Sequence, residues 1–310
     1  MSKLKLFTMS AGAFICGSCI ASGCCQSCCP GGCCPKTPKA KAAQPKQEQA
    51  VSKDQQIKQA IKDAYSKVVE SNNTSTDTCA VGACSCAGGC CGGGEDLSKY
   101  LGYSKEELES VAGANLGLGC GHPVSLGEIK EGQTVLDLGS GAGIDCLLAA
   151  KKVGLTGKVI GVDMTQSMIN KARENAAKYN ANNVEFRLGD IEELPVSDST
   201  VDIIISNCVI NLATDKQKVF NESWRVLKTG GSMYVSDVIL LAPLTKEQQN
   251  DTQLLCACIG GALLKDDYIN KMQKSGFAIK IVDEDTTICQ KWFGHNDLPI
   301  ASLKFIATKQ

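Results

Sequence analysis

From Thr134 onward, short apolar runs alternate with amphipathic stretches of about three helical turns. Strands that alternate with helices are typical of a parallel sheet with right-handed crossovers. We therefore expect an α/β domain whose sheet carries helices on both faces. The predicted strands lie at 134–139, 158–163, 184–189, 201–207 and 232–238, and the predicted helices at about 144–153, 166–179 and 215–227.

Less regular patterns flank this part of the chain. Residues 54–70 place apolar side chains on one helical face, at Ile57, Ile61, Tyr65 (or Ala64) and Val68. A second helix is predicted at SKEELESVAG, where Ser104 and Glu107 have the spacing of a capping box. After Asp237 the pattern predicts helices near 245–256 and 265–275 and short strands near 277–283 and 302–307. We interpret these last pieces as a small α+β cap beside the sheet.

The first 53 residues have no pattern that builds a core, and we expect a disordered Cys-rich tail with a flexible linker. Lys3 and Lys5 followed by an apolar run could alternatively be a signal peptide, and Ala21–Cys24 loosely resembles a lipoprotein cleavage box. The resulting domain prediction is a tail (1–53), N-terminal helices with a mobile Cys loop (54–125), a nucleotide-type domain (126–242) and a cap (243–310).

Charge and cysteine content narrow the function. The formal net charge is −1 and aromatic residues make up 5% of the chain, which argues against a nucleic-acid partner. The chain has 19 cysteines, an odd number that rules out complete pairing within one chain, and only 2 histidines. Six cysteines lie within the α/β part. Scattered thiols in such a fold indicate a reducing compartment and thiols that take part in chemistry.

The stretch TVLDLGSGAGIDC predicts a ligand pocket. A buried strand, a turn with Gly139, Gly141 and Gly143, and a helix N-terminus let a ligand approach the backbone. Asp137 precedes the first glycine, and Asp163 ends the next strand, where it can hold two ribose hydroxyls. An acid before the glycines suits a cationic cofactor with an amino group better than a pyrophosphate. This favours S-adenosylmethionine over NAD.

Two cysteines are expected at the same rim of the sheet. Cys146 lies in the first turn of the helix after the glycine loop, and Cys208 directly follows the strand VDIIISN. The two strands concerned are expected to be neighbours, so both thiols should lie beside the cofactor, and the helix N-terminus should favour the Cys146 thiolate. Soft thiolates select soft ions such as trivalent arsenic, whose lone pair can attack a sulfonium methyl without a base. Positioning and water exclusion then supply most of the catalysis.

Several motifs in this order closely resemble the arsenite methyltransferase family: DLGSGAGIDC, GVDM, SNCVINLATDKQKVF, RVLKTGG, SDV and CIGGAL. The similarity runs from about Ile57 to the C-terminus. The resemblance implies a Rossmann-like class I methyltransferase sheet, S-adenosylmethionine as methyl donor and stepwise methylation of thiol-bound As(III), an arsenic detoxification. The implied partners are As(III)–thiol conjugates and a thiol reductant such as glutathione or thioredoxin.

The resemblance also implies roles for individual residues. Cys146 and Cys208 resemble the two thiols that hold arsenic, and Cys79 resembles a third thiol from the loop. Cys258 matches a family cysteine, and we expect it to be structural. The cofactor-binding positions that match the family are Asp137, Gly139, Gly141, Asp163, Met164, Asp190, Ile191 and Asn207.

Two other functions remain open at this point. One is methylation of another small acceptor, such as a quinone or sterol, which explains the fold but not the rim cysteines. The other is a soft-metal-binding protein with an inactive methyltransferase fold. We expect a cytoplasmic protein with no membrane association, because S-adenosylmethionine is kept in that compartment. A lipoprotein anchor is the alternative if residues 1–23 are a signal.

Overall fold

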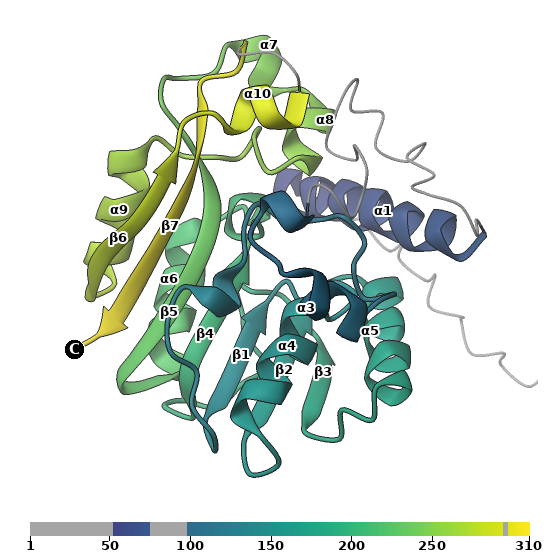
Figure 1. Ribbon diagram of the computed structural model, residues 1–310. Coiled ribbons are helices and arrows are strands. Elements are labelled where there is room, and N and C mark those ends of the chain that lie inside the picture. The colour runs from purple at the N-terminus through teal and green to yellow at the C-terminus, as the bar shows by residue number, and fades with distance from the viewer. Residues whose placement is uncertain (1–51, 75–97, 294–296) are drawn as a thin grey trace, which may run out of the picture. The chain divides into compact units, whose positions relative to one another are not determined.

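The computed structural model describes residues 52–74, 98–293 and 297–310, which contain a seven-stranded sheet (Figure 1). The strand order is β3-β2-β1-β4-β5-β7-β6. The strands are β1 (Thr134–Leu138), β2 (Lys158–Asp163), β3 (Val184–Leu188), β4 (Val201–Asn207), β5 (Leu227–Leu240), β6 (Phe277–Asp285) and β7 (Ile300–Lys309). The five strands predicted from the apolar runs are confirmed, and β1 pairs in parallel with both β2 and β4.

The C-terminal strands differ from the expectation of a separate cap. β7 pairs antiparallel with β5 from Ser232↔Thr308 to Leu240↔Ile300, and β6 pairs antiparallel with β7. Both strands therefore extend the main sheet. The physical reason is the length of β5, whose 14 residues offer a long second edge for pairing. Of the expected cap, short helices remain at the carboxyl end of the sheet.

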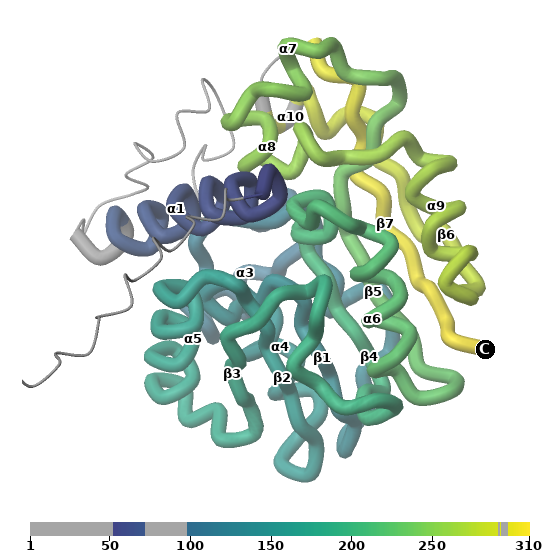
Figure 2. The backbone as a smooth tube through the Cα atoms, turned by 180° about the vertical axis from the view of Figure 1, so that it is seen from behind, coloured from purple at the N-terminus to yellow at the C-terminus, as the bar shows by residue number. Residues whose placement is uncertain are grey.

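Helices pack on both faces of the sheet, as Figures 1 and 2 show from opposite sides. Because side chains of a strand point alternately to opposite faces, Val135 packs in a cluster with α4, whereas Leu136 and Leu138 pack in one with α6 and α9. The helices are α1 (Lys53–Thr74), α3 (Lys105–Ser110), α4 (Ile144–Val153), α5 (Gln166–Lys178), α6 (Lys216–Val226), α7 (Lys246–Gln249), α8 (Thr252–Cys256), α9 (Lys265–Lys274) and α10 (Ile288–Phe293), with 3-10 turns η1 (Pro123–Ser125) and η2 (Ile210–Leu212).

The helix boundaries follow local capping chemistry. Ser104 and Glu107 form the predicted capping box at the start of α3. The single helix expected near 245–256 is instead two, because the Asp251 side chain accepts hydrogen bonds from the backbone of Gln253 and Leu254 and starts α8 anew. Among the helices that the structure describes, none is long and apolar enough to cross a membrane.

The buried centre of β1 provides a test of the core. Leu136 is completely buried, whereas Leu155 is 95% exposed in the turn after α4. We expect Leu136→Ala to lower the free energy of unfolding by about 2–5 kcal/mol, because it removes buried methyl groups and leaves a cavity. The matched change Leu155→Ala should cost less than about 0.5 kcal/mol. Urea denaturation followed by circular dichroism measures both, and equal losses would contradict the described core.

Candidate active site

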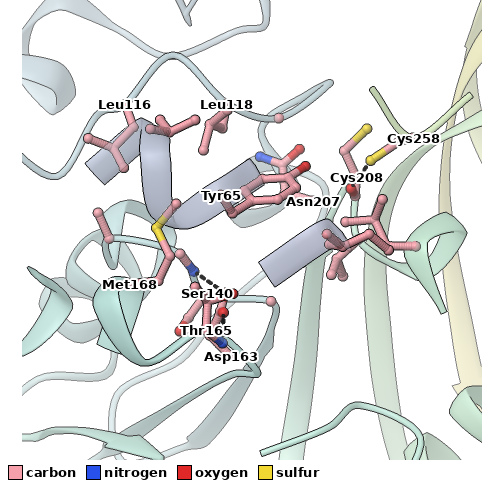
Figure 3. Close-up of a pocket in the computed structure, with 18 of the residues that line it drawn as sticks. Tyr65, Leu116, Leu118, Ser140, Asp163, Thr165, Met168, Asn207, Cys208 and Cys258 are labelled. Atoms are coloured by element: carbon pink, nitrogen blue, oxygen red, sulfur yellow. Dashed lines mark hydrogen bonds between the residues drawn. The ribbon is translucent and has the colours of Figure 1, made fainter. Parts of the chain in front are cut away.

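A cavity opens at the carboxyl ends of β1, β2 and β4, and residues of α1 and α8 also line it. Figure 3 shows some of the lining side chains. Ligands of open α/β sheets bind at this edge. All eight residues predicted from the sequence to contact a cofactor line this one cavity, although their role toward a cofactor stays a prediction. They are Asp137, Gly139, Gly141, Asp163, Met164, Asp190, Ile191 and Asn207.

The glycine loop leaves room for a ligand at its centre. Gly139 and Gly141 have φ angles of +65° and +51°, a region that favours glycine. A side chain at Gly139 would come within 2.3 Å of Val209, whereas nothing lies within 4 Å of the position that a Cβ would take at Gly141. Next to it, the Ser140 Oγ is buried without a hydrogen-bond partner among the described residues. The loop therefore offers open space and an unused polar atom.

Two buried carboxyl groups give this end of the cavity its charge preference. Asp137 and Asp145 are 2% and 4% exposed, and both line the cavity. Asp145 accepts hydrogen bonds from the Tyr103 hydroxyl (2.8 Å) and the Asn207 amide (3.1 Å). Burial raises the pKa of both carboxyls, and the Asp145 charge raises that of Asp137 further. Ionising two adjacent buried carboxyl groups is unfavourable, and a positively charged ligand beside them would offset that cost. The pair therefore fits a ligand with a sulfonium and an amino group.

Polar groups at the other end of the cavity are held by short bonds. The Asp163 carboxylate accepts hydrogen bonds from the backbone of Gly141 (3.0 Å) and Thr165 (2.8 Å), which fixes it against the glycine loop. Asp190 accepts a hydrogen bond from Lys58 of α1 at 2.7 Å, and Lys58 also pairs with Glu192 at 2.9 Å. This ion pair attaches α1 to the cavity rim.

Cys208 and Cys258 lie side by side in the cavity wall (Figure 3). The Cys258 thiol donates a hydrogen bond of 2.6 Å to the Cys208 carbonyl. Cys208 directly follows β4 with a φ of +57°, and Cys258 follows α8 with a φ of +63°. Cys258 occupies the position after the helix C-cap that glycine normally takes, since its N–H bonds Leu255 and that of Ile259 bonds Leu254. Such non-glycine residues cost about 1–3 kcal/mol and gather at functional sites.

The structure places Cys146 behind the cavity that Cys208 lines, and not in the cavity wall as expected. Cys146 is completely buried in the apolar cluster that α4 shares with β1, and its thiol donates a hydrogen bond of 3.2 Å to Asp137, which does line the cavity. The expected lowering of its pKa is also wrong. Burial and the nearby Asp137 raise the pKa of Cys146 well above its usual value, because they outweigh the helix N-terminus.

The outcome for the other cysteines is mixed. Cys79 lies outside the described residues. Cys258, expected to be structural, reaches the cavity instead, and Cys256 lines it as well. The sequence CACIGG contains both Cys256 and Cys258. It was not predicted to line the cavity because site residues are expected at the ends of strands, and this segment lies at the end of a helix. Tyr65 and Ile61 of α1 were also missed as cavity residues, because their apolar spacing predicts only a packed helix face.

Asp237 lies beneath this wall at the carboxyl half of β5 and is completely buried. Its carboxylate accepts hydrogen bonds from the Asn211 amide (2.9 Å), the Val238 N–H (2.9 Å) and the Tyr268 hydroxyl (3.0 Å). Burial raises the pKa of Asp237 to about 7, against an ordinary value of 3.8. This carboxyl therefore changes its charge near neutral pH.

The sequence is similar to methyltransferases over much of its length. A family model described as a methyltransferase domain matches residues 129–276. An arsenite methyltransferase of Halobacterium salinarum is 50% identical over 217 residues, which cover 68% of this chain and 56% of that protein. The human arsenite methyltransferase is 41% identical over 168 residues, 51% of this chain and 44% of that protein. The chain thus spans about half the length of the curated relatives it matches.

Solved structures show the same architecture. An arsenic(III) S-adenosylmethionine methyltransferase from Chlamydomonas reinhardtii superimposes with a TM-score of 0.55 at 33% identity, covering 69% of this chain and 73% of that one. A phosphoethanolamine N-methyltransferase of Haemonchus contortus gives a TM-score of 0.54 at 20% identity, which supports the fold alone.

The pKa of Asp237 gives a testable pH dependence. Between pH 3.8 and about 7 this carboxyl is neutral in the folded protein but ionised in the unfolded chain, so its contribution to stability falls as pH rises through that window. Asp237→Asn has no such proton to lose. The free energy of unfolding of the variant should therefore improve relative to the parent as pH rises, as measured by urea denaturation across the window. Parallel pH profiles for the two proteins would contradict the assigned shift.

Proposed function

This chain belongs to the arsenite methyltransferase family, and we propose that it transfers a methyl group from S-adenosylmethionine to trivalent arsenic held by its cysteine thiolates. The single observation that supports this most strongly is the pair Cys208 and Cys258, which share a cavity with the glycine loop. Arsenic bound by these two thiolates would lie beside the place where a methyl donor would bind.

The residues of the cavity fit the cofactor. Asp137 and Asp145 would hold the amino and sulfonium groups, the loop at Gly139 and Gly141 would approach the methionine part, and Asp163 would bind the ribose hydroxyls. Met164, Asp190 and Ile191 would surround the adenine, and Asn207 would contact the methionine part beside β4. When bound, S-adenosylmethionine supplies an electrophilic methyl group.

The protein side of the reaction is the capture of arsenic. Hydrogen bonding to Cys120 and Cys258, together with burial, raises the pKa of the Cys208 thiol well above its usual value, so this thiol carries its proton at neutral pH. A protonated Cys208 can still bind arsenic by exchange with an As(III)–thiol conjugate. The bond between arsenic and the conjugate's sulfur breaks, a bond between arsenic and the Cys208 sulfur forms, and the displaced thiolate takes the proton from Cys208. The bound arsenic keeps its lone pair, which is the nucleophile.

The surroundings of Cys208 and Cys258 favour the same reaction. Ile61, Leu212 and Trp292 cover the thiols, and these side chains exclude water that would compete for the methyl group. Cys79, which lies outside the described residues, is proposed as a third thiolate. Each methylation oxidises arsenic by two electrons, so repeated turnover requires a dithiol or glutathione as reductant. The product would be a set of methylated arsenicals, consistent with detoxification.

Substitution of the two cavity thiols tests the arsenic ligands. Cys208→Ser and Cys258→Gly should each lower the rate of arsenite methylation by at least about tenfold, since outer-shell changes at metal sites alone cost about 10–100-fold. Glycine suits the backbone at residue 258 and keeps the helix end intact. Cys146→Ser retains a donor to Asp137 and is the matched control, with most activity kept. Product speciation after incubation with As(III), glutathione and S-adenosylmethionine measures all three.

The opposite pattern would redirect the assignment. Activity lost in Cys146→Ser but kept in Cys208→Ser would show that the cavity thiols do not hold arsenic. Undiminished methyl transfer to a quinone by Cys208→Ser would favour the alternative acceptor. A bacterial ubiquinone/menaquinone C-methyltransferase is 36% identical to this chain over 121 residues, which makes a quinone the acceptor to include.

Cofactor binding can be tested separately from arsenic. Asp163→Asn removes the charge that faces the ribose site, and one charge-assisted hydrogen bond is worth about 1.5–3 kcal/mol. We expect roughly a 10–100-fold weaker affinity for S-adenosylmethionine by isothermal titration calorimetry. Cys208→Ser should bind the cofactor as the parent does. Equal affinities for Asp163→Asn and the parent would show that Asp163 does not contact the ribose.

A further inference from the structure

A second group of side chains that could hold a metal ion lies next to the cavity wall that Cys208 and Cys258 form. The sulfurs of Cys120 and Cys208 and a carboxylate oxygen of Asp237 all lie within 4.8 Å of one another. The three residues come from separate parts of the fold, namely the segment before η1, the end of β4 and the carboxyl half of β5. Cys120 and Asp237 are 1% and 0% exposed.

We propose that Cys120, Cys208 and Asp237 bind a thiophilic divalent cation such as Zn²⁺ or Cd²⁺, and that this cation inhibits the enzyme by occupying Cys208. Thiolate sulfurs and carboxylate oxygens are both ligands that such ions accept. Trivalent arsenic prefers three thiolates, so a set of two thiolates and one carboxylate favours a divalent cation over arsenic. The part of the proposal that concerns inhibition rests on the proposed function, whereas cation binding does not.

The spacing suits a cation after small side-chain movements. Zinc binds thiolates at about 2.3 Å and carboxylates at about 2.0–2.2 Å in a tetrahedral site, which places neighbouring ligand atoms roughly 3.5–3.8 Å apart. Atoms that already lie within 4.8 Å of one another reach these distances by small rotations of their side chains. A solvent molecule or the nearby Cys258 could complete the coordination.

Hydrogen bonds already orient the ligands. One oxygen of Asp237 (Oδ1) accepts hydrogen bonds from the Asn211 amide and the Val238 N–H, whereas the other (Oδ2) accepts one from the Tyr268 hydroxyl and keeps a lone pair for a cation. The backbone of Cys120 is fixed on both sides, since its N–H donates to the Asn207 side chain at 2.9 Å and its carbonyl accepts from the Ser236 hydroxyl at 3.2 Å. Partners of this kind tune metal sites and select ligand orientation.

Packing alone does not explain this arrangement. A free buried cysteine usually behaves as a small apolar residue. Here two thiols surround a completely buried carboxyl group, which apolar packing disfavours. A thiol must lose its proton to bind a cation, so cation binding at this group would release protons.

The group has a route for entry on the side away from the methyl-donor cavity. Cys120 lines a second hollow together with Asp283, Glu284, Asp285 and Lys304. Lys304 pairs with Asp283 at 3.0 Å and Lys265 pairs with Glu284, so three acids face two lysines. A hollow with excess negative charge raises the local concentration of cations. Cys208, in contrast, is reached from the cavity of the proposed reaction.

Chelator-buffered Cd²⁺ tests the proposal on the full-length protein, because the buffer fixes the free ion concentration whatever the other cysteines bind. We compare the parent, Cys120→Ser and the control Cys289→Ser, which replaces another buried cysteine. At equal free Cd²⁺, Cys120→Ser should bind one ion fewer and need at least about a tenfold higher concentration for half-inhibition of arsenite methylation, while Cys289→Ser matches the parent. Half-inhibition of each protein is measured relative to its own rate of arsenite methylation without Cd²⁺.

Equal Cd²⁺ stoichiometry in the parent and Cys120→Ser would overturn the site. A loss of one ion without any change in inhibition would overturn the regulatory role alone. If the protein fails to methylate arsenic at all, the stoichiometry still decides whether the cation binds. Should Cys120→Ser fold poorly by circular dichroism, Asp237→Asn serves as the second variant. Anomalous scattering from Cd²⁺-soaked crystals of the parent then locates the ion, and no peak among the three side chains would refute the site.

Discussion

The parallel pairing of β1 with β4 is the contact on which the site depends. It brings the end of β1, with Asp137 and the glycine loop, beside the end of β4, with Asn207 and Cys208. Parallel strands end at the same edge of a sheet, so groups far apart in the sequence meet there. The acids that suit a cationic donor and the thiols that suit a soft acceptor thereby share one cavity. Neither set alone would indicate methylation of arsenic.

Two further elements complete this edge. α1 closes the cavity through Tyr65 and Ile61 and is attached by the Lys58 ion pair with Asp190 and Glu192. The turn after α8 brings Cys258 to Cys208. Both cysteines have left-handed backbones, which is an unfavourable choice for any residue except glycine. Retention of a thiol at two such positions is understandable if the sulfurs have a function.

The sequence predicted the strands and helices of the α/β part because their periodicity is a local property. It did not predict that β6 and β7 join the sheet, because pairing partners depend on which edges remain open after folding. All eight predicted cofactor residues were found together because the motif and the strand ends determine them. Cys146 was assigned to the wrong surroundings since its position in a helix turn does not reveal which side of the helix it faces. Cys258 was predicted to be structural because the spacing of residues along the sequence does not reveal that the turn after α8 approaches the end of β4.

A structure with bound substrate decides whether the cavity thiols hold arsenic. Crystals soaked with As(III) and analysed by anomalous scattering at the arsenic absorption edge would locate the metalloid within the fold. We expect one strong peak bonded to the sulfurs of Cys208 and Cys258, on the cavity side that faces the glycine loop. A peak at Cys146, or arsenic bound only to cysteines distant from the cavity, would contradict this expectation.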